Sequence, residues 1–426
     1  MPNGAATAHL YLPKLATVLR EGYHFDDFRR DALAGLTVAI VALPLSMAIA
    51  VGSGVTPERG LYTAIVGGFV VSALSGSRYQ IGGPAGAFIV LVAATAAKYG
   101  IDGLLLAVFL SGIMLTVAGL LKIGSLIRHI PHAVTVGFTF GIAVTILASQ
   151  LTNLGGFTLD GPEPGPLFPK LAALVAASSS LNPAALGLGL GTITLIFGLK
   201  RLRPNWPNML IALTVASVAA VLLDYNVETI GSHFGGIPHT LPSPKMPDMS
   251  YAHILEILPS AFSFTLLGGV ESLLSAKVAD GMTGRQHRSN MELVGQGLAN
   301  MASALFGGIS VTGTIARTAT NIRAGGRSPV AGIMHAVFLL IFMLVAAPLA
   351  SYAPLSALAG VLVAVCWTMA EKKEFYRLLG DWRTAAVLLA TFGLTVTMDL
   401  TTGIIAGCEI AALFAILKRR VPKEGD

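Results

Sequence analysis

The sequence predicts an all-α protein that crosses a membrane many times, and three observations lead to this fold class. The chain of 426 residues is 54% hydrophobic but only 12% charged, whereas soluble domains carry about 25% charged residues. Apolar runs such as 34–52 and 330–350 approach or reach the ~20 residues that span a bilayer as a helix. Lysine and arginine collect in alternate loops between such runs, as in polytopic membrane proteins.

We expect fourteen membrane-spanning segments. Their ranges are 31–52, 57–76, 84–98, 103–121, 130–150, 184–199, 206–223, 259–277, 290–306, 314–325, 329–348, 354–369, 384–398 and 400–417. Residues 167–181 instead predict a helix outside the bilayer. With both termini in the cytoplasm, the opposite face holds few basic residues, namely Arg59, Lys98, Lys170 and Lys245. The net charge of +6 therefore follows from membrane orientation, and no nucleic-acid partner is expected.

The spanning segments divide into two halves of seven. We expect a cytoplasmic segment at 1–30, a first repeat at 31–223, an extracytoplasmic loop and helix at 224–258, a second repeat at 259–418 and a cytoplasmic tail at 419–426. The first spans of the two halves begin 228 residues apart (259 − 31 = 228). Because seven is odd, the second repeat must be inverted relative to the first, an arrangement found in many transporters.

Two segments at matching positions, the third and the tenth, are interrupted in the same way. Residues 79–100 and 307–326 each open with an extended stretch, reach a glycine and continue as a short helix. Gly83 and Gly313 lie 230 residues apart (313 − 83 = 230), close to the spacing of the halves. Broken helices at matching positions of inverted repeats predict a transporter binding site. The alternative is that these glycines are purely structural.

The short helix near Thr314 carries a full positive charge, Arg317, one turn from its start. Its free N–H groups and positive dipole end are expected near the bilayer centre, as are those of the helix after Pro84. Two converging helix N-termini predict an anion site built mainly from backbone donors, to which Arg317 adds its charge. The alternative is that Arg317 ties helices together through a buried carboxylate.

Glu271 is the deep carboxylate that we expect to matter for transport, and it lies beside Ser272 and Ser275. A carboxylate in such a place exchanges protons or holds a cation beside other oxygens, whereas a neutral packing role is the alternative. Glu409, in the last span, is expected to be structural. The sequence shows no nucleotide-binding loop, metal-ligand cluster or Ser–His–Asp arrangement, so neither an enzyme nor a cofactor is expected.

Four separated blocks resemble the SulP family, solute carrier family 26, and within it the bacterial branch that includes a C4-dicarboxylate transporter. The blocks are 31–68, 82–88, 271–284 and 313–325. The resemblance implies a seven-plus-seven inverted-repeat fold with a moving core domain and a gate domain. It also implies elevator-like transport by a homodimer in the plasma membrane, with the anion held between the third and tenth segments.

The resemblance also implies roles for individual residues. At the substrate it places Ser46, Ile49, Ala85, Gly86, Ala87, Thr314, Ile315, Ala316 and Arg317. At the coupling ion it places Glu271 and Ser275, with Gly313 beside them, and these would form a sodium site if the ion is not a proton.

The sequence departs from the family in three respects. Leu45 follows Pro44, where many relatives have glutamine, and Ala316 replaces a frequent serine, so sulfate-like specificity is not favoured. The chain stops just past its last span, so we expect it to lack the C-terminal STAS domain that relatives usually carry.

These observations together predict a secondary active transporter of small anions. We expect C4-dicarboxylates such as succinate as substrates, with proton coupling through Glu271. Sodium-coupled bicarbonate uptake and sulfate uptake are the alternatives within the family. An anion channel is a further alternative, but a channel needs a continuous polar path, which a single charged cluster does not provide.

Overall fold

The computed structural model describes residues 11–124, 131–159, 161, 164, 167–204, 206–398 and 400–420, most of them helical. Within these ranges, seven helical stretches are long and apolar enough to cross a membrane. They are α3 (Phe25–Gly52), Gly86–Leu120 (the 3-10 turn η3, Gly86–Phe88, and α6, Ile89–Leu120), α8 (His132–Gly155), α10 (Pro183–Leu202), α13 (Tyr251–Thr283), α16 (Val330–Ala350) and Leu355–Leu378 (α17, Leu355–Met369, and α18, Lys372–Leu378). Shorter apolar helices are α9 (Leu167–Ala176), α11 (Asn208–Leu222), α19 (Trp382–Thr397) and the Thr402–Ile416 part of α20 (Leu400–Arg420).

The remaining elements are short, except for α14. They are α2 (Lys14–Glu21), α4 (Pro57–Tyr62), the π-helical turn η2 (Thr63–Gly67), α5 (Gly68–Leu74), β1 (Gly82–Gly83), the turn η4 (Ser178–Ser180), α12 (Ile230–Phe234), α14 (Ser289–Leu305), β2 (Thr312–Gly313) and α15 (Ile315–Arg323). The long helix α6 is broken at Gly100, whose φ of 70° suits glycine, so two helices meet there, as the ranges 84–98 and 103–121 predict. The chain is thus a mostly helical membrane protein, while fourteen crossings and an inverted repeat stay predictions.

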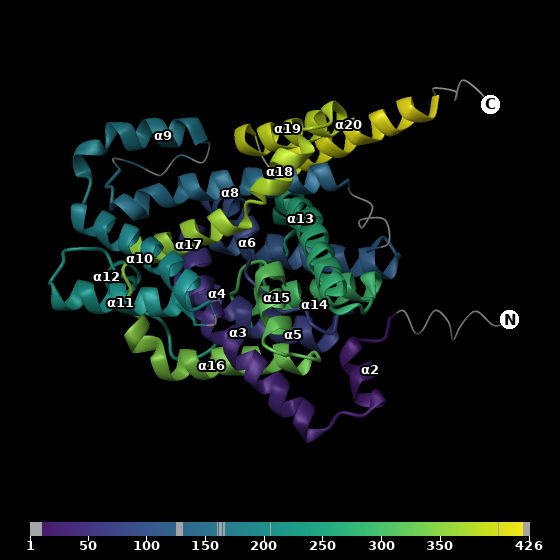
Figure 1. The fold of residues 1–426 in the computed structure, drawn as a ribbon, viewed down its shortest axis with the longest axis horizontal. Helices are drawn as coiled ribbons and strands as arrows, with labels where there is room; N and C mark the ends of the chain where they lie inside the picture. Colours follow the sequence, from purple (N-terminus) through teal and green to yellow (C-terminus); the bar gives the residue numbers. More distant parts are fainter. Residues whose placement is uncertain are drawn as a thin grey trace.

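The helices pack into two groups, and each group draws on both halves of the sequence. The first helix group contains α3 to α6 together with α13 to α16, with α6 against α14 and α3 against α16. The second helix group contains α8, α10 and α11 together with α17 to α20, with α8 against α17 and α19. In Figure 1, α8, α19 and α20 lie in the upper part of the molecule, and α3, α5 and α16 lie in the lower part. This division agrees with two structural units, and the assignment of one as a moving core domain and the other as a gate domain stays a prediction from the family resemblance.

The ends of the described chain lie toward the same side. In Figure 1, α2 and the last turns of α20 are at the right, whereas α9 and α12 are at the left. This agrees with two termini on one face, whereas the place of the helix near 167–181 outside the bilayer stays a prediction. Which face is cytoplasmic stays a prediction, and residues 1–10 and 421–426 of the expected cytoplasmic ends lie outside the described residues.

Two helices begin earlier than the predicted spans. The helix α3 starts at Phe25 rather than at residue 31. At this earlier start, His24 and Asp27 form a capping box. The helix α13 starts at Tyr251 rather than 259 and continues through Pro259, so the expected boundary at 258/259 falls inside it. An apolar run predicts only the part of a helix that lies in lipid. Because the backbone hydrogen bonds of the helix continue beyond the lipid, the helix itself begins before the predicted span.

A close glycine contact joins α6 to α14 in the first helix group. A Cβ on Gly112 would lie 2.6 Å from the carbonyl oxygen of Gly297, and a Cβ on Gly297 would lie 2.3 Å from Oγ1 of Thr116. Small residues let membrane helices approach to backbone contact. The spacing of α6 and α14 therefore depends on both glycines.

We expect Gly297→Leu to destabilise the protein, because the new side chain must push α14 away from α6. The cost should be at least about 1–3 kcal/mol, the usual range for overpacking. The melting temperature in detergent measures it. The matched control is Gly187→Leu in α10, where an added Cβ meets nothing within 4 Å. Equal melting temperatures of the two variants would contradict the helix contact.

Candidate functional site

The two interrupted segments meet as a short antiparallel strand pair. Gly82 of β1 pairs with Gly313 of β2, and Gly83 pairs with Thr312. Other atoms lie where a side chain would begin, since a Cβ on Gly313 would come 1.6 Å from Nε2 of Gln80. The segments that match each other in the sequence therefore lie side by side in space.

Both segments change from extended backbone to helix just beyond the strand pair. Ala85 is extended and η3 follows it, while Thr314 is extended and α15 follows it. The N–H of Thr314 donates to the carbonyl oxygen of Ile81 at 3.1 Å, which fixes where α15 begins. The first N–H groups of a helix have no acceptor within the helix. Backbone donors thus flank the strand pair from opposite sides, as an anion site requires.

Arg317 lies in the first turn of α15 and is only 2% exposed. Its Nη2 donates to Oγ of Ser46 at 3.1 Å and to the carbonyl oxygen of Pro84 at 3.3 Å. Its Nε and Nη1 are buried without an acceptor, and no carboxylate of the described residues forms an ion pair with it. Arg317 therefore links three segments through a hydroxyl and a carbonyl, rather than through the carboxylate of the alternative interpretation.

The other predicted substrate residues fall into a buried set and an accessible set. Gly86 is partly buried, and Ile315 and Ala316 at the start of α15 are exposed. Gly86 faces the second helix group, since an added Cβ would lie 3.6 Å from Cδ1 of Ile146 in α8. The strand pair and its helices thus lie where the two helix groups meet. The buried residues are Ser46, Ile49, Ala85, Ala87 and Thr314.

Glu271 and Ser275 lie one turn apart on the face of α13 that packs against β2 and α15. Oγ of Ser275 donates to Oγ1 of Thr318 in α15 at 3.3 Å. On the same face, Oγ1 of Thr312 contacts the carbonyl oxygen of Gly268 at 3.4 Å. Oε2 of Glu271 is buried without a hydrogen-bond partner among the described residues. The structure therefore brings the predicted coupling residues next to the helix that carries Arg317, whereas Glu409 lies exposed on α20.

The sequence did not single out two buried titratable side chains, Glu292 and His335, and both are fully buried. Glu292 accepts from the N–H of Gly76 and from Oγ of Ser272, each at 3.1 Å. Neither ring nitrogen of His335, in α16, has a partner within the described part of the chain. The small and apolar residues around Glu292 in "MELVGQGLANM" were the only signal, and a weak one, because glutamate is mostly exposed and is fully buried only when it has a partner.

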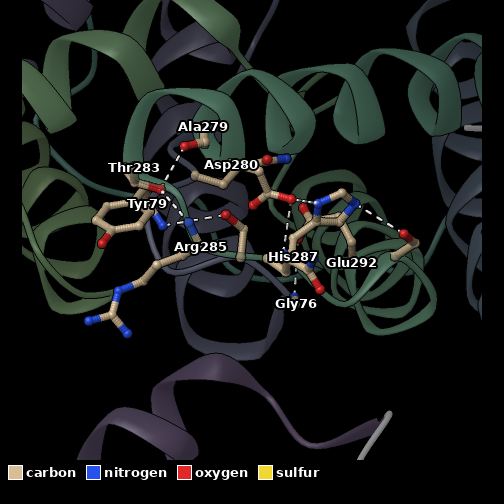
Figure 2. A network of polar contacts seen from close by, with 12 residues as sticks. Gly76, Tyr79, Ala279, Asp280, Thr283, Arg285, His287 and Glu292 are labelled. Carbon is tan, nitrogen blue, oxygen red and sulfur yellow. Dashed lines mark hydrogen bonds and ion pairs between the residues drawn. The ribbon is translucent and has the colours of Figure 1, made fainter.

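A Ser–His–Asp arrangement, which the sequence did not show, is present in the turn between α13 and α14. Nδ1 of His287 lies 2.6 Å from Oδ2 of Asp280, and Nε2 lies 3.0 Å from Oγ of Ser289. Figure 2 shows His287 between Asp280 and the start of α14, with Glu292 and Gly76 close by. The backbone N–H of His287 also donates to Asp280 at 3.1 Å. The arrangement closes the turn, and Asp280, His287 and Ser289 line neither of the two cavities found among the described residues.

Comparison with known proteins relates the whole described fold to anion transporters. A model of the sulfate permease family matches residues 28–391. A Bacillus subtilis protein named "Putative sulfate transporter YvdB" is 43% identical over 399 residues, which covers 93% of this chain and 75% of that protein. The bicarbonate transporter BicA of Picosynechococcus is 31% identical over 408 residues, which covers 92% of this chain and 71% of that protein.

Solved structures give the same result for the fold. The transmembrane domain of a cyanobacterial bicarbonate transporter BicA superposes with a TM-score of 0.79 at 29% identity, covering 89% of this chain and 98% of that one. The murine anion transporter Slc26a9, in its inward-facing state, superposes with a TM-score of 0.87 at 18% identity, covering 98% of this chain and 73% of that one. None of these names mentions a dicarboxylate.

We expect Gly83→Ala to displace the guanidinium of Arg317, because the added Cβ would lie 1.9 Å from Nη1. Affinity for a sulfate or bicarbonate probe should fall at least about tenfold, as when one charged hydrogen bond is lost. Isothermal titration of the purified protein measures this affinity, and circular dichroism verifies the helix content. The control is Gly191→Ala in α10, where an added Cβ meets nothing within 4 Å. Unchanged affinity in Gly83→Ala would show that the position of Arg317 does not matter for binding.

Proposed function

Because the chain belongs to the sulfate permease family, we propose that it carries a small oxyanion held between the β1–η3 segment and the start of α15. It is an anion transporter of this family and a multi-pass membrane protein. The observation that carries the proposal is Arg317, a buried guanidinium with two unpartnered nitrogen atoms and no neutralising carboxylate among the described residues. A bound anion would supply the missing charge and the missing acceptors.

The surroundings of Arg317 favour an inorganic oxyanion over a C4-dicarboxylate. Among the described residues, Arg317 and Lys170 are the only buried cations, and Lys170 belongs to α9 outside the first helix group. A dicarboxylate has a second carboxylate, which would need another donor set some distance away. Sulfate or bicarbonate needs one cluster of donors, and the names of the relatives point to these anions. The C4-dicarboxylate expectation stays a prediction with less support.

The polar contacts of Arg317 favour transport by movement of the first helix group. Ser46, Pro84 and Arg317 all belong to this group, and so does Ser275, which contacts α15. The second helix group faces Gly86 with the apolar Ile146. An anion held by one group can therefore travel with it past an apolar surface, as in an elevator mechanism. A homodimer stays an expectation from the family resemblance.

The place of Glu271 favours coupling of transport to a cation. Its carboxylate lies on the α13 face that contacts β2 and α15, and one of its oxygens has no partner. We propose that this carboxylate takes up and releases a proton during the cycle, and that sodium held by Glu271 and Ser275 is the alternative. Either cation would reduce the negative charge next to the anion site, so that anion and cation bind together.

Uptake of labelled sulfate, bicarbonate and succinate into proteoliposomes tests the substrate. We expect sulfate or bicarbonate to be accumulated faster than succinate, and to show counterflow, because a carrier exchanges bound anions. Arg317→Ala should lower uptake at least about tenfold, since the buried charge is lost, while Arg323→Ala at the exposed end of α15 should not. Faster succinate uptake would favour the dicarboxylate, absence of counterflow would favour a channel, and full activity of Arg317→Ala would make Arg317 structural.

Glu271→Gln separates the coupling ions. The amide keeps the size of the side chain and some hydrogen bonding but cannot release a proton, so we expect loss of pH-driven accumulation while anion exchange persists. Uptake is measured with pH and sodium gradients imposed separately, and Glu256→Gln, exposed near the start of α13, is the matched control. Accumulation by Glu271→Gln under a pH gradient alone would rule out the proton role. Loss of a sodium response instead would assign the residue to sodium.

A further inference from the structure

A cavity of about 300 Å³ lies between α2, the start of α3 and three loops. The loops are those before β1, after α13 and after α15, and they contribute Arg78 and Tyr79, Arg285, and Arg327 respectively. Neither Arg317 nor Glu271 lines this cavity. Its volume is at the lower end of the range of small-molecule sites, about 300–1,000 Å³. The cavity is therefore large enough for a ligand and separate from the proposed transport site.

The walls of the cavity carry more positive than negative charge. Three arginines face two carboxylates, those of Glu21 and Asp27. Arg78 donates to both carboxylate oxygens of Glu21, while Nη1 of Arg327 is 3.9 Å from Asp27. Arg285 forms no ion pair with another described residue. Figure 2 shows its guanidinium extending past Tyr79 and away from Asp280 and His287. At least one guanidinium is therefore available to a ligand.

The electrostatic surroundings support a surplus of positive charge. The hydrogen bond from Arg78 lowers the pKa of Glu21, and the charges of Arg285 and Lys14 lower it further. Burial lowers the pKa of Lys14, and the neighbouring charges of Arg288 and Arg78 add to this effect. The lowered pKa of Glu21 thus reflects the surrounding cations, whereas the pKa of Lys14 is lowered first by burial and then by those cations. An incoming anion would relieve this repulsion.

Two of the three loops, those before β1 and after α15, are attached to segments of the proposed transport site. The carbonyl oxygen of Tyr79 accepts from Nδ2 of Asn321 in α15 at 2.9 Å. The N–H of Arg327 donates to Oδ1 of Asp31 in α3 at 2.7 Å, which holds the loop after α15 against α3. The backbone of these two loops is thus fixed, and their arginines line the cavity together with Arg285. Preorganised guanidinium groups from separate loops are what phosphate recognition uses.

We propose that this cavity is a second anion site, which binds a phosphate group at the end of the molecule where α2 lies. Arg285 and Arg327 supply the positive charge that Glu21 and Asp27 do not neutralise. Ser328, Tyr23 and Tyr79 complete the walls. The phosphate belongs either to a soluble phosphorylated compound or to the headgroup of an acidic phospholipid. Both sources present tetrahedral phosphate oxygens to the arginines, as a monoanion in a phosphodiester headgroup and as a monoanion or dianion in a phosphate monoester.

Titration of the full chain in neutral detergent with inorganic pyrophosphate tests the site. We expect the double variant Arg285→Gln/Arg327→Gln to lose affinity at least about tenfold, because two charge-assisted contacts disappear. The control double variant Arg20→Gln/Arg201→Gln removes the same charge from exposed arginines that do not line the cavity, and its affinity should be unchanged. Equal losses in the two double variants would overturn the proposal, since only general charge would then matter.

A second measurement separates the two sources and the two sites. The chain is placed in nanodiscs of phosphatidylcholine with or without phosphatidylglycerol, and pyrophosphate affinity is measured again. Unchanged affinity supports a soluble ligand, and competition by phosphatidylglycerol that disappears in Arg285→Gln/Arg327→Gln supports a headgroup. Arg317→Ala should retain pyrophosphate binding. If Arg317→Ala abolishes it and the cavity variant does not, the phosphate binds at the transport site and the second site is refuted, while the proposed function stands.

Discussion

The architecture depends on one buried positive charge that the protein does not neutralise with a carboxylate of its described residues. A guanidinium moved out of water costs several kcal/mol unless hydrogen bonds or a counter-charge compensate it. Arg317 receives two compensating acceptors, Ser46 on α3 and Pro84 before η3, and retains two nitrogens without any. Such a site is stable enough to fold but still favours an anion. In the proposed function, the same incomplete compensation is the source of the affinity for the anion.

The strand pair makes this placement possible, because it lets two backbones approach where no side chain could fit. Gly83 leaves the space that the guanidinium of Arg317 fills, and Gly313 leaves the space that Gln80 fills. Hydrogen bonds between Ile81 and the first turn of α15 then hold the two broken helices at a fixed distance. Since these parts all belong to the first helix group, the elevator movement that we propose would carry the site as a unit past the second group, which meets Gly86 with the apolar Ile146.

Polar side chains around this unit connect it to the side of the molecule where α2 lies. Glu292 accepts from Ser272, and Ser272 accepts from Nε2 of Gln80 at 2.8 Å, so the chain of contacts reaches from the first turn of α14 to a residue just before the strand pair. The turn itself is closed by Asp280, His287 and Ser289 (Figure 2). A Ser–His–Asp hydrogen-bond chain is therefore not evidence of hydrolysis by itself. Here it lies in a tight turn of a transporter-family protein and holds that turn together.

The sequence by itself determined the helical membrane class, the two interrupted segments and the choice of Arg317 and Glu271, because apolar run length, glycine position and a charge among apolar residues are local properties. Only the tertiary structure decided which groups face each other. It paired Gly82 with Gly313, gave Arg317 a hydroxyl and a carbonyl instead of a carboxylate, and buried Glu292 and His335. It also joined the helix expected within 224–258 to the span expected from 259, since α13 runs from Tyr251 through Pro259 without a break. Whether a side chain is buried, and which group it contacts, depends on residues far away in the chain. Arg317 and its partner Ser46 are 271 positions apart (317 − 46 = 271), and the periodicity within one segment carries no information about such pairs.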